Sequence, residues 1–400
     1  MIKISKKTYI GITTCVIFLI GVIIYITPSI PNYDIQNYYL HTNKYISKID
    51  NFKPIYFHNE WLYCSDGDKI VRTNNYGETL DFVANIEHSN WILNVLKRFY
   101  LTTRIARLDV YRLRVLQNGT IVFSTKEGIF RVKPKEKTAK LVYKTDGSRP
   151  ISLTVDKNDT LYFGEYHSNP NRNAMAIFAS YNNGNTFERI YSFPSNTIRH
   201  IHAVEYDKYD DCLWVATGDT DSETYLLRMS LDCKQVETIA KGGQKNRYFE
   251  IKVLPNKIFI TPDAPSERNQ ITIYDKKNKR LTKLFSIESP AFFSTIIGNY
   301  YFFATSNEPS AKGKSEYLAS HVYAININTL KYKKIGILGT DILYRLSILK
   351  INPIPGLFQF SQPYFPEGES IDKTKLVIYG NGLKGFWNDA YLWDISNLNF

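Results

Sequence analysis

The chain has 400 residues, of which 14% are aromatic, and its formal net charge is +12. This length excludes a minimal domain and predicts one large repeat-built domain plus an anchor, while the charge favours either solubility or attraction to an anionic partner such as an acidic glycan or a lipid surface. The sequence contains no P-loop, dinucleotide fingerprint, Gly-x-Ser-x-Gly elbow or His-Glu-x-x-His helix, so the enzyme classes defined by these motifs are not indicated.

The N-terminal stretch 8–27 contains no charged side chain. It is long enough to cross the hydrocarbon core of a membrane, which takes about 20 residues of helix. Lys3, Lys6 and Lys7 precede it, and no Lys or Arg follows before Lys44. Because positive charge stays on the cytoplasmic side, we expect a single-pass protein whose N-terminus is cytoplasmic and whose bulk is extracytoplasmic.

These features predict a cytoplasmic tail at 1–7, a transmembrane signal-anchor helix at 8–27 and a polar, Tyr- and Asn-rich stalk at 28–52. A cleaved signal peptide is the alternative. Its apolar region is usually shorter and ends in small residues, whereas this one ends in Tyr-Ile-Thr-Pro. We therefore favour an uncleaved anchor that holds the protein on a membrane. The exported topology argues against a nucleic-acid partner.

From residue 53 to the end, short strand-like runs alternate with turn signals, which is typical of an all-β fold. Residues 199–240 show the unit best, with four strands in about 40 residues, the spacing of a β-propeller blade. We predict a β-propeller over 53–400, with seven blades, or six if the terminal strands complete one blade. The apolar spacing near 90–107 is helical and predicts a helical insertion there.

Two segments carry a family resemblance. Ser180-Tyr-Asn-Asn-Gly-Asn-Thr-Phe187 resembles the Asp-box of BNR-repeat proteins, S-x-D-x-G-x-T-W, and Thr73-Asn-Asn-Tyr-Gly-Glu-Thr-Leu80 is a looser copy. The motif is a hairpin turn in which Asn or Asp caps the turn and Gly takes a positive φ. The resemblance implies the propeller fold of the sialidase-like superfamily. It does not extend to the sialidase catalytic residues, for which the chain shows no convincing match.

Candidate functional residues gather at one rim of three consecutive predicted blades. In a propeller, the connections between blades share a face with the loops between second and third strands, and this face commonly holds the site. His200 and His202 lie two apart on one innermost strand, so their side chains point the same way and converge. The residues assigned to substrate binding at this rim are Glu165, His167, Arg199, Gln244 and Asp263.

One chemistry that suits this set is β-elimination on an acidic polysaccharide. A base removes the proton α to a uronate carboxylate, and Arg or a divalent cation stabilises the negative charge that develops. His200 or His202 would act as the base, Tyr248 as the acid and Arg247 as the neutralising group. Propeller-type lyases that act on acidic polysaccharides are similar to the chain in architecture and in His, Arg and Tyr content.

A second chemistry is glycoside hydrolysis by two carboxylates, for which Glu165, Asp219 and Glu223 are the candidates. The acidic turn after Gly218 also predicts a cation site at Asp219 and Asp221, with oxygen ligands that suit Ca²⁺ or a similar divalent ion. An ordinary acidic turn is the alternative. The third class is a propeller without catalysis that binds a carbohydrate or a cell-surface protein, because this architecture serves many functions.

Overall fold

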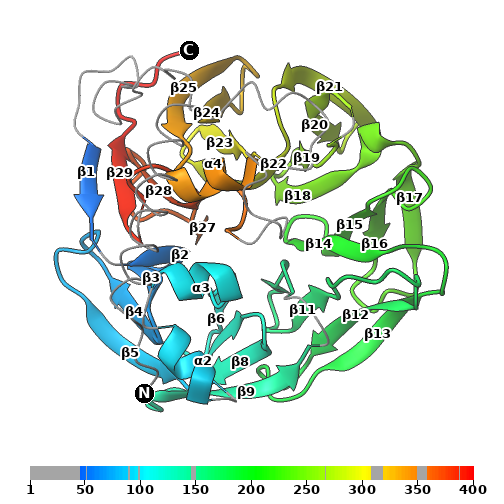
Figure 1. Ribbon diagram of the computed structural model, residues 1–400. Helices are drawn as coiled ribbons and strands as arrows, with labels where there is room; N and C mark the ends of the chain where they lie inside the picture. The colour runs from blue at the N-terminus through cyan, green and yellow to red at the C-terminus, as the bar shows by residue number, and fades with distance from the viewer. Residues whose placement is uncertain are drawn as a thin grey trace, which may run out of the picture.

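The computed structural model describes residues 46–50, 52–88, 91–97, 100–145, 150–265, 267–307, 319–348, 358–386 and 388–400. The predicted membrane span at 8–27 lies outside these residues. Within the described ranges, no helix combines the length and the apolar character needed to cross a membrane. The described chain is dominated by β-strands arranged in a ring of sheets, with α2, α3 and α4 near the face turned to the viewer (Figure 1).

Four sheets follow the chain order and contain four antiparallel strands each. They are β10 (Thr154–Val155), β11 (Leu161–Gly164), β12 (Met175–Ser180) and β13 (Glu188–Phe193); β14 (His200–Asp207), β15 (Cys212–Gly218), β16 (Tyr225–Met229) and β17 (Val236–Lys241); β18 (Tyr248–Val253), β19 (Lys257–Pro262), β20 (Asn269–Asp275) and β21 (Arg280–Ile287); and β22 (Ala291–Ile297), β23 (Tyr300–Thr305), β24 (Ala319–Asn326) and β25 (Tyr332–Gly339).

A larger sheet joins two further groups of four antiparallel strands. Its strands are β2 (Lys53–His58), β3 (Trp61–Asp66), β4 (Lys69–Thr73), β5 (Asp81–Ile86), β6 (Arg112–Val115), β7 (Ile121–Ser124), β8 (Gly128–Val132), β9 (Thr138–Lys144) and β27 (Glu367–Gly368). The outer strands β5 and β9 meet in a short parallel pairing, and β27 lies parallel to β2. The first strand of each group therefore lies toward the middle of the ring and the last toward its rim (Figure 1).

The remaining sheet closes the ring by combining both ends of the described chain. It consists of β1 (Ile46–Ile49), β29 (Ala390–Asp394), β28 (Lys375–Asn381) and β26 (Gln362–Tyr364), in that order. β1 lies inside the stretch expected to be a stalk, so the folded part begins earlier than residue 53. The strand has only four residues and no turn signal before it, which explains why its pattern does not stand out in the sequence.

Three neighbouring innermost strands are bulged near their N-terminal ends. The register of β14 shifts between Ile201 and Ala203, and β18 and β22 shift at corresponding places. A bulge inserts one extra residue and redirects its side chain. His202, Phe249 and Phe292 lie in these bulges, and their rings follow one another, with centroids 5.6 Å and then 4.5 Å apart. The bulges thus turn one ring per sheet toward the middle of the molecule.

The two Asp-box-like segments form turns with the same hydrogen bonds. In the second copy, the Gly184 amide donates to Ser180 Oγ at 3.0 Å and the Thr186 amide donates to Asn182 Oδ1 at 2.9 Å. In the first copy, the matching bonds run from Gly77 to Thr73 Oγ1 and from Thr79 to Asn75 Oδ1. Both glycines have a positive φ, so Asn performs the capping role of Asp in these turns.

Three short helices of the described chain lie near the face of the ring that is turned to the viewer in Figure 1. α2 (Trp91–Leu96) and α3 (Tyr100–Ala106) fall in the stretch expected to contain a helical insertion, and α4 (Ile342–Ile348) comes from the far end of the chain. Arg104 of α3 is almost fully buried and forms an ion pair with Asp341, the residue before α4. This pair holds two insertions together that are far apart in the sequence.

Cys212 and Cys233 are buried free thiols. Cys212 packs with Trp214 on one face of its sheet. Cys233 packs with Leu213 and Met229 on the opposite face. Because successive strand residues point to opposite faces, the sheet itself separates the two sulfur atoms.

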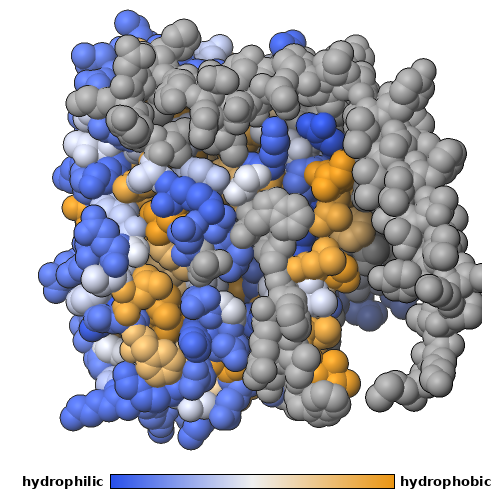
Figure 2. Space-filling view, turned by 60° about the vertical axis from the view of Figure 1, so that its left-hand side comes forward, coloured by the Kyte–Doolittle hydropathy of each residue, from blue (hydrophilic) through white to orange (hydrophobic). Residues whose placement is uncertain are grey.

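On the side of the ring that Figure 2 brings forward, many of the described residues are hydrophilic. On this side, the described hydrophobic residues occur in separate groups between hydrophilic ones. Scattered apolar residues of this kind are normal on a folded domain. The apolar side chains that hold the fold lie between neighbouring sheets, in clusters such as the one around Ile201, Val204 and Leu213.

Candidate functional site

Five of the predicted site residues come together at one end of the ring. His200 and His202 lie on β14, Asp219 follows β15, Arg247 precedes β18 and Asp263 follows β19. Because the first and second strands of each sheet are antiparallel, the start of one lies beside the end of the other. Two neighbouring sheets therefore deliver their polar residues to the same place.

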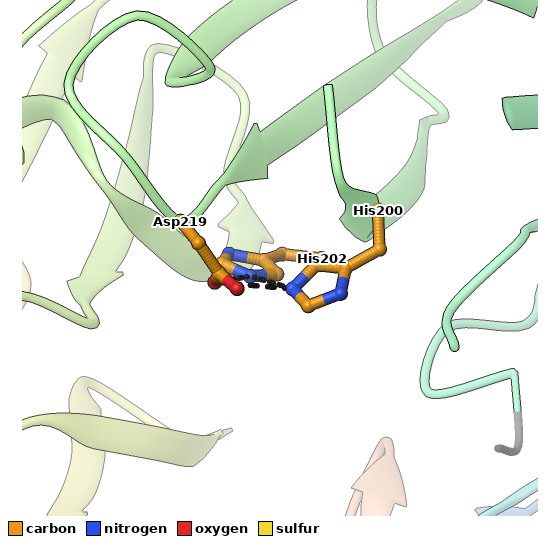
Figure 3. Close-up of side chains that lie close together, drawn as sticks. All are labelled: His200, His202 and Asp219. Carbon is orange, nitrogen blue, oxygen red and sulfur yellow. Dashed lines mark hydrogen bonds and ion pairs between the residues drawn. The ribbon is translucent and has the colours of Figure 1, made fainter. Parts of the chain in front are cut away.

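The two imidazoles face each other. His200 Nε2 lies 3.1 Å from His202 Nε2 (Figure 3). On the other side of each ring, Nδ1 contacts a backbone carbonyl, at 2.7 Å from His202 to Tyr248 O and at 3.3 Å from His200 to His167 O. A carbonyl can only accept, so each Nδ1 carries a proton, and a neutral ring then presents an Nε2 lone pair. Burial lowers the pKa of His200, which favours this neutral form.

Asp219 completes the group (Figure 3). Its Oδ1 lies 3.1 Å from His200 Nε2 and 3.6 Å from His202 Nε2. Arg199 and Arg247 each contact one of its carboxylate oxygens at 2.9 Å, and these guanidinium groups favour the ionised form of Asp219. His200, His202 and Asp219 offer three ligand atoms that could hold a metal ion.

Two arginines and a second carboxylate surround this group. Arg247 Nη2 lies 2.9 Å from Asp219 Oδ1 and 2.8 Å from Asp263 Oδ2, so it bridges the two acids. Arg199 Nη1 contacts Asp219 Oδ2 at 2.9 Å. Asp263 is 4% exposed, and burial raises its pKa while Arg247 opposes that rise.

The site opens into a cavity of about 440 Å³. Aromatic side chains form much of its wall, including Tyr166, whose ring centroid lies 4.3 Å from that of His200. The other wall residues are Arg107, Ile151, His167, Ser168, Phe249, Phe292, Phe293, Gln359, Phe360 and Gln362. Sequence reasoning assigned no role to Phe249 or Phe292. A comparison of the first strands of successive blades would have found them, because they share the bulge position of His202.

Other predicted residues are directed elsewhere. Glu223 pairs with Arg172, and a Glu165 carboxylate oxygen accepts a hydrogen bond from the Ala176 amide at 2.6 Å. These carboxylates thus have structural partners outside the group. Tyr248 is fully buried in the apolar layer between two sheets, and burial raises its pKa to about 12. Only its carbonyl reaches the site, so the structure does not support the expected role as an acid.

Three remaining candidate residues lie around the group formed by His200, His202 and Asp219. His167 lines the cavity and supplies the carbonyl that orients His200. Gln244 donates its side-chain amide to the Asp219 carbonyl at 2.8 Å and supports the loop. Asp221 is exposed and does not belong to the group of possible ligands formed with Asp219. The expected Asp219–Asp221 cation site is therefore replaced by a pairing of Asp219 with two histidines.

A second cavity, of about 650 Å³, is lined by the C-terminal halves of the inner strands, whereas the site described above lies at their N-terminal ends. Glu367 there accepts ion pairs from Arg114 at 2.7 Å and from Lys252 at 2.9 Å. Glu205 faces the same cavity. Burial raises its pKa to about 7, although Lys252 partly opposes the rise. These charges lie on inner strands and hold neighbouring sheets together.

No protein-family model matches the chain, and no curated protein matches it. Solved structures do resemble it. The WD40 β-propeller domain of Doa1 has a TM-score of 0.53 at 8% sequence identity, over 90% of this chain and 98% of that one. An ancestral GH74 enzyme has a TM-score of 0.52 at 12% identity, over 87% of this chain but only 45% of that one. At such identities the likeness concerns the fold alone, and together with the ring of antiparallel sheets it identifies the chain as a β-propeller.

Proposed function

We propose that the chain is a membrane-anchored, extracytoplasmic β-propeller that recognises or processes acidic glycans. The charge-free stretch 8–27 and the lysines before it support the anchor. Seven groups of four strands support seven blades, the last one closed by β1. The matching turns at 73–80 and 180–187 support a BNR-like repeat.

The observation that carries the glycan proposal is the mixed character of the 440 Å³ cavity. Aromatic walls with a few well-placed polar groups are typical of small-ligand sites. Arg199 adds a specific donor, since its buried Nε has no hydrogen-bond partner among the described residues. A guanidinium group suits a carboxylate. An acidic saccharide unit would place its ring against the aromatic wall and its carboxylate toward Arg199.

Between the two enzyme chemistries, the geometry favours β-elimination. Hydrolysis needs two free carboxylates, and Glu165 and Glu223 are both engaged with other groups. In the elimination, a base takes the proton α to the uronate carboxylate, the bond from C4 to the bridging oxygen breaks, and a C4–C5 double bond forms. The leaving oxygen takes up a proton. His200 and Tyr166 both line the cavity, and either could accept the first proton.

The test uses the full chain purified in mild detergent with a panel of acidic and neutral polysaccharides. The absorbance of the unsaturated uronate is followed in the ultraviolet, and reducing ends are measured in parallel. We expect an absorbance rise that His200→Gln or Tyr166→Phe abolishes, while His58→Gln and Tyr332→Phe, which lie away from the cavity, retain it. Reducing ends without absorbance would instead indicate hydrolysis.

A non-catalytic glycan-binding propeller is the second candidate, and one observation favours it. Both Nδ1 atoms of His200 and His202 meet backbone carbonyls, and their Nε2 atoms lie 3.1 Å apart, so each ring nitrogen already lies against another polar atom of the protein. This candidate predicts no product in either assay. It also predicts that calorimetry detects saccharide binding to the unmodified chain and that Arg199→Ala abolishes this binding. Silence in both assays together with no binding to any acidic saccharide would reject the glycan proposal.

A further inference from the structure

We infer that His200, His202 and Asp219 bind one divalent transition-metal ion, and that Asp263 contacts this ion directly or through a water ligand. The inference concerns the metal alone and does not depend on the nature of the substrate. It rests on the arrangement of three ligand atoms, on the groups that orient them, and on a buried carboxylate oxygen that has no hydrogen-bond partner in the part of the chain that the structure describes. Each of these observations is independent of the others.

The three ligand atoms have the spacing of a coordination site. The separations among His200 Nε2, His202 Nε2 and Asp219 Oδ1 are 3.1, 3.1 and 3.6 Å. Ligands bound at about 2.0–2.1 Å lie about 2.8–3.0 Å apart at octahedral angles and about 3.3–3.4 Å apart at tetrahedral angles. Two of the three separations fall between these values, and the third, 3.6 Å, is slightly longer. A circle through the three atoms has a radius of about 1.9 Å, so an ion slightly out of their plane reaches all three at about 2.1 Å.

The rings are oriented as metal-ligating histidines are. In such sites the ring nitrogen away from the metal usually donates to a carbonyl or a carboxylate, which fixes the tautomer and the direction of the other nitrogen. Both Nδ1 atoms here meet backbone carbonyls. The two Nε2 lone pairs then point at each other and at a carboxylate oxygen. That contact is repulsive unless a cation or a shared proton lies between them, and a metal ion satisfies all three atoms at once.

Asp263 supplies the second kind of observation. It is 4% exposed and lines the same cavity, and its Oδ2 lies 3.9 Å from His202 Nε2. Its Oδ1 is buried with no hydrogen-bond partner among the described residues. A buried carboxylate oxygen without a partner is costly. A nearby divalent ion, directly or through a water ligand, would satisfy it.

A bound cation would make the site positively charged. Arg199 and Arg247 already pair with Asp219 and Asp263, so the charge of a divalent ion would be added to an arrangement in which the acids have partners. Arg247 and the ion can share Asp219 Oδ1, because a carboxylate oxygen has two lone pairs. The excess positive charge would attract the anionic group of a ligand in the cavity.

The donor set selects the class of metal. Two imidazole nitrogens and one carboxylate suit Zn²⁺, Mn²⁺, Fe²⁺, Co²⁺ or Ni²⁺. Calcium prefers six to eight oxygen ligands, so this site does not suit the ion that the acidic turn suggests. Three protein ligands leave coordination positions open, as in catalytic rather than structural sites.

The test measures metal binding directly. Untagged full chain, purified in mild detergent and dialysed against a chelator, is titrated with Zn²⁺ and Mn²⁺ by calorimetry. Co²⁺ is added in parallel, because its visible absorption reports nitrogen and oxygen ligation. We expect one ion per chain. The variants are His202→Gln and Asp219→Asn, with His58→Gln and Asp221→Asn as matched controls, and thermal unfolding verifies that each one is folded.

Loss of a ligand should weaken binding at least as much as loss of a supporting outer partner, which costs roughly 10–100-fold. We therefore expect His202→Gln and Asp219→Asn to bind at least about tenfold more weakly, while both controls bind like the unmodified chain. Absence of binding to the folded chain would overturn the inference in favour of a proton shared by the histidines. Binding that survives both ligand substitutions, or that is lost in Asp221→Asn, would also overturn it. None of these outcomes depends on whether a glycan binds.

Discussion

Arg104 and Asp341 form a buried ion pair across 237 positions of sequence and join the insertion containing α3 to the segment that begins α4. The second guanidinium nitrogen lies 3.3 Å from the other carboxylate oxygen, so the contact is a two-pronged one. The Phe358 carbonyl accepts a further bond from Arg104 at 2.6 Å, and Gln359 contacts the Arg104 carbonyl. Because Arg107, Gln359 and Phe360 line the cavity, this pair positions one wall of the candidate site.

Removal of Asp341 should therefore be costly. Asp341→Ala leaves a buried guanidinium unpaired, and breaking a buried pair in this way typically costs about 3–5 kcal/mol. The matched control is Glu237→Ala, which removes the partner of Arg228 in an exposed pair and should cost less than about 1 kcal/mol. Denaturant unfolding of the full chain measures both. Equal losses in the two variants would contradict the structural role of the pair.

A second prediction concerns the backbone conformation of Gly184 and its effect on the free energy of unfolding. Its φ is +70°, and an added Cβ would lie 2.7 Å from Val122 Cγ2. Gly184→Ala should lower the free energy of unfolding by about 1–3 kcal/mol, because it adds strain and a close contact. Gly339→Ala is the control, since a Cβ there meets nothing within 4 Å. The proposed turn role would be wrong if the two variants unfolded at the same denaturant concentration.

Glu205 predicts a dependence of stability on pH. Burial raises its pKa from 4.5 to about 7, so the folded state holds the proton more tightly than the unfolded state. The stabilising contribution of this proton is complete below about pH 4.5 and is lost as pH rises through about 7. A glutamine at this position cannot titrate, so the Glu205→Gln variant does not lose this contribution as the pH rises. Its stability relative to that of the unmodified chain should therefore be higher at pH 8 than at pH 5. Thermal unfolding at both pH values tests this, with Glu237→Gln expected to show no such gain.

The metal inference predicts a change in stability upon chelation. A ligand that binds only the folded state stabilises it by about 2.7 kcal/mol at a free concentration 100 times its Kd. Chelator treatment should therefore lower the thermal midpoint of the full chain, and Zn²⁺ or Mn²⁺ should restore it. The midpoint of His202→Gln should not respond to either treatment. A chelator effect of the same size in that variant would place the responsible ion elsewhere.

The sequence predicted the fold best where local chemistry determines it. Strand alternation and turn residues indicated the propeller, which the structure and its likeness to solved propellers confirm at the level of the fold. Asn182 and Gly184 act locally, and their hydrogen bonds match the expected turn. β1 escaped notice because only its pairing with β29, at the other end of the chain, makes those four residues a strand.

The rim was predicted from topology, which is why His200, His202, Asp219 and Arg247 were found together. Their partners were not predictable in the same way. Glu223 reaches its partner Arg172 from a different sheet, and such a pairing depends on side-chain direction rather than on strand order. Asp221 differs from Asp219 by only two positions, yet it is exposed and lies outside the group.

The pairing of β1 with β29 also bears on how the chain matures. β1 comes early in the described chain, but its hydrogen-bond partner β29 comes near the end, so this pairing forms only after β29 has been synthesised. Until then β1 has no partner in that sheet, and its edge stays unpaired. A chain that stops short of residue 390 lacks β29, and β1 then has no partner in that sheet.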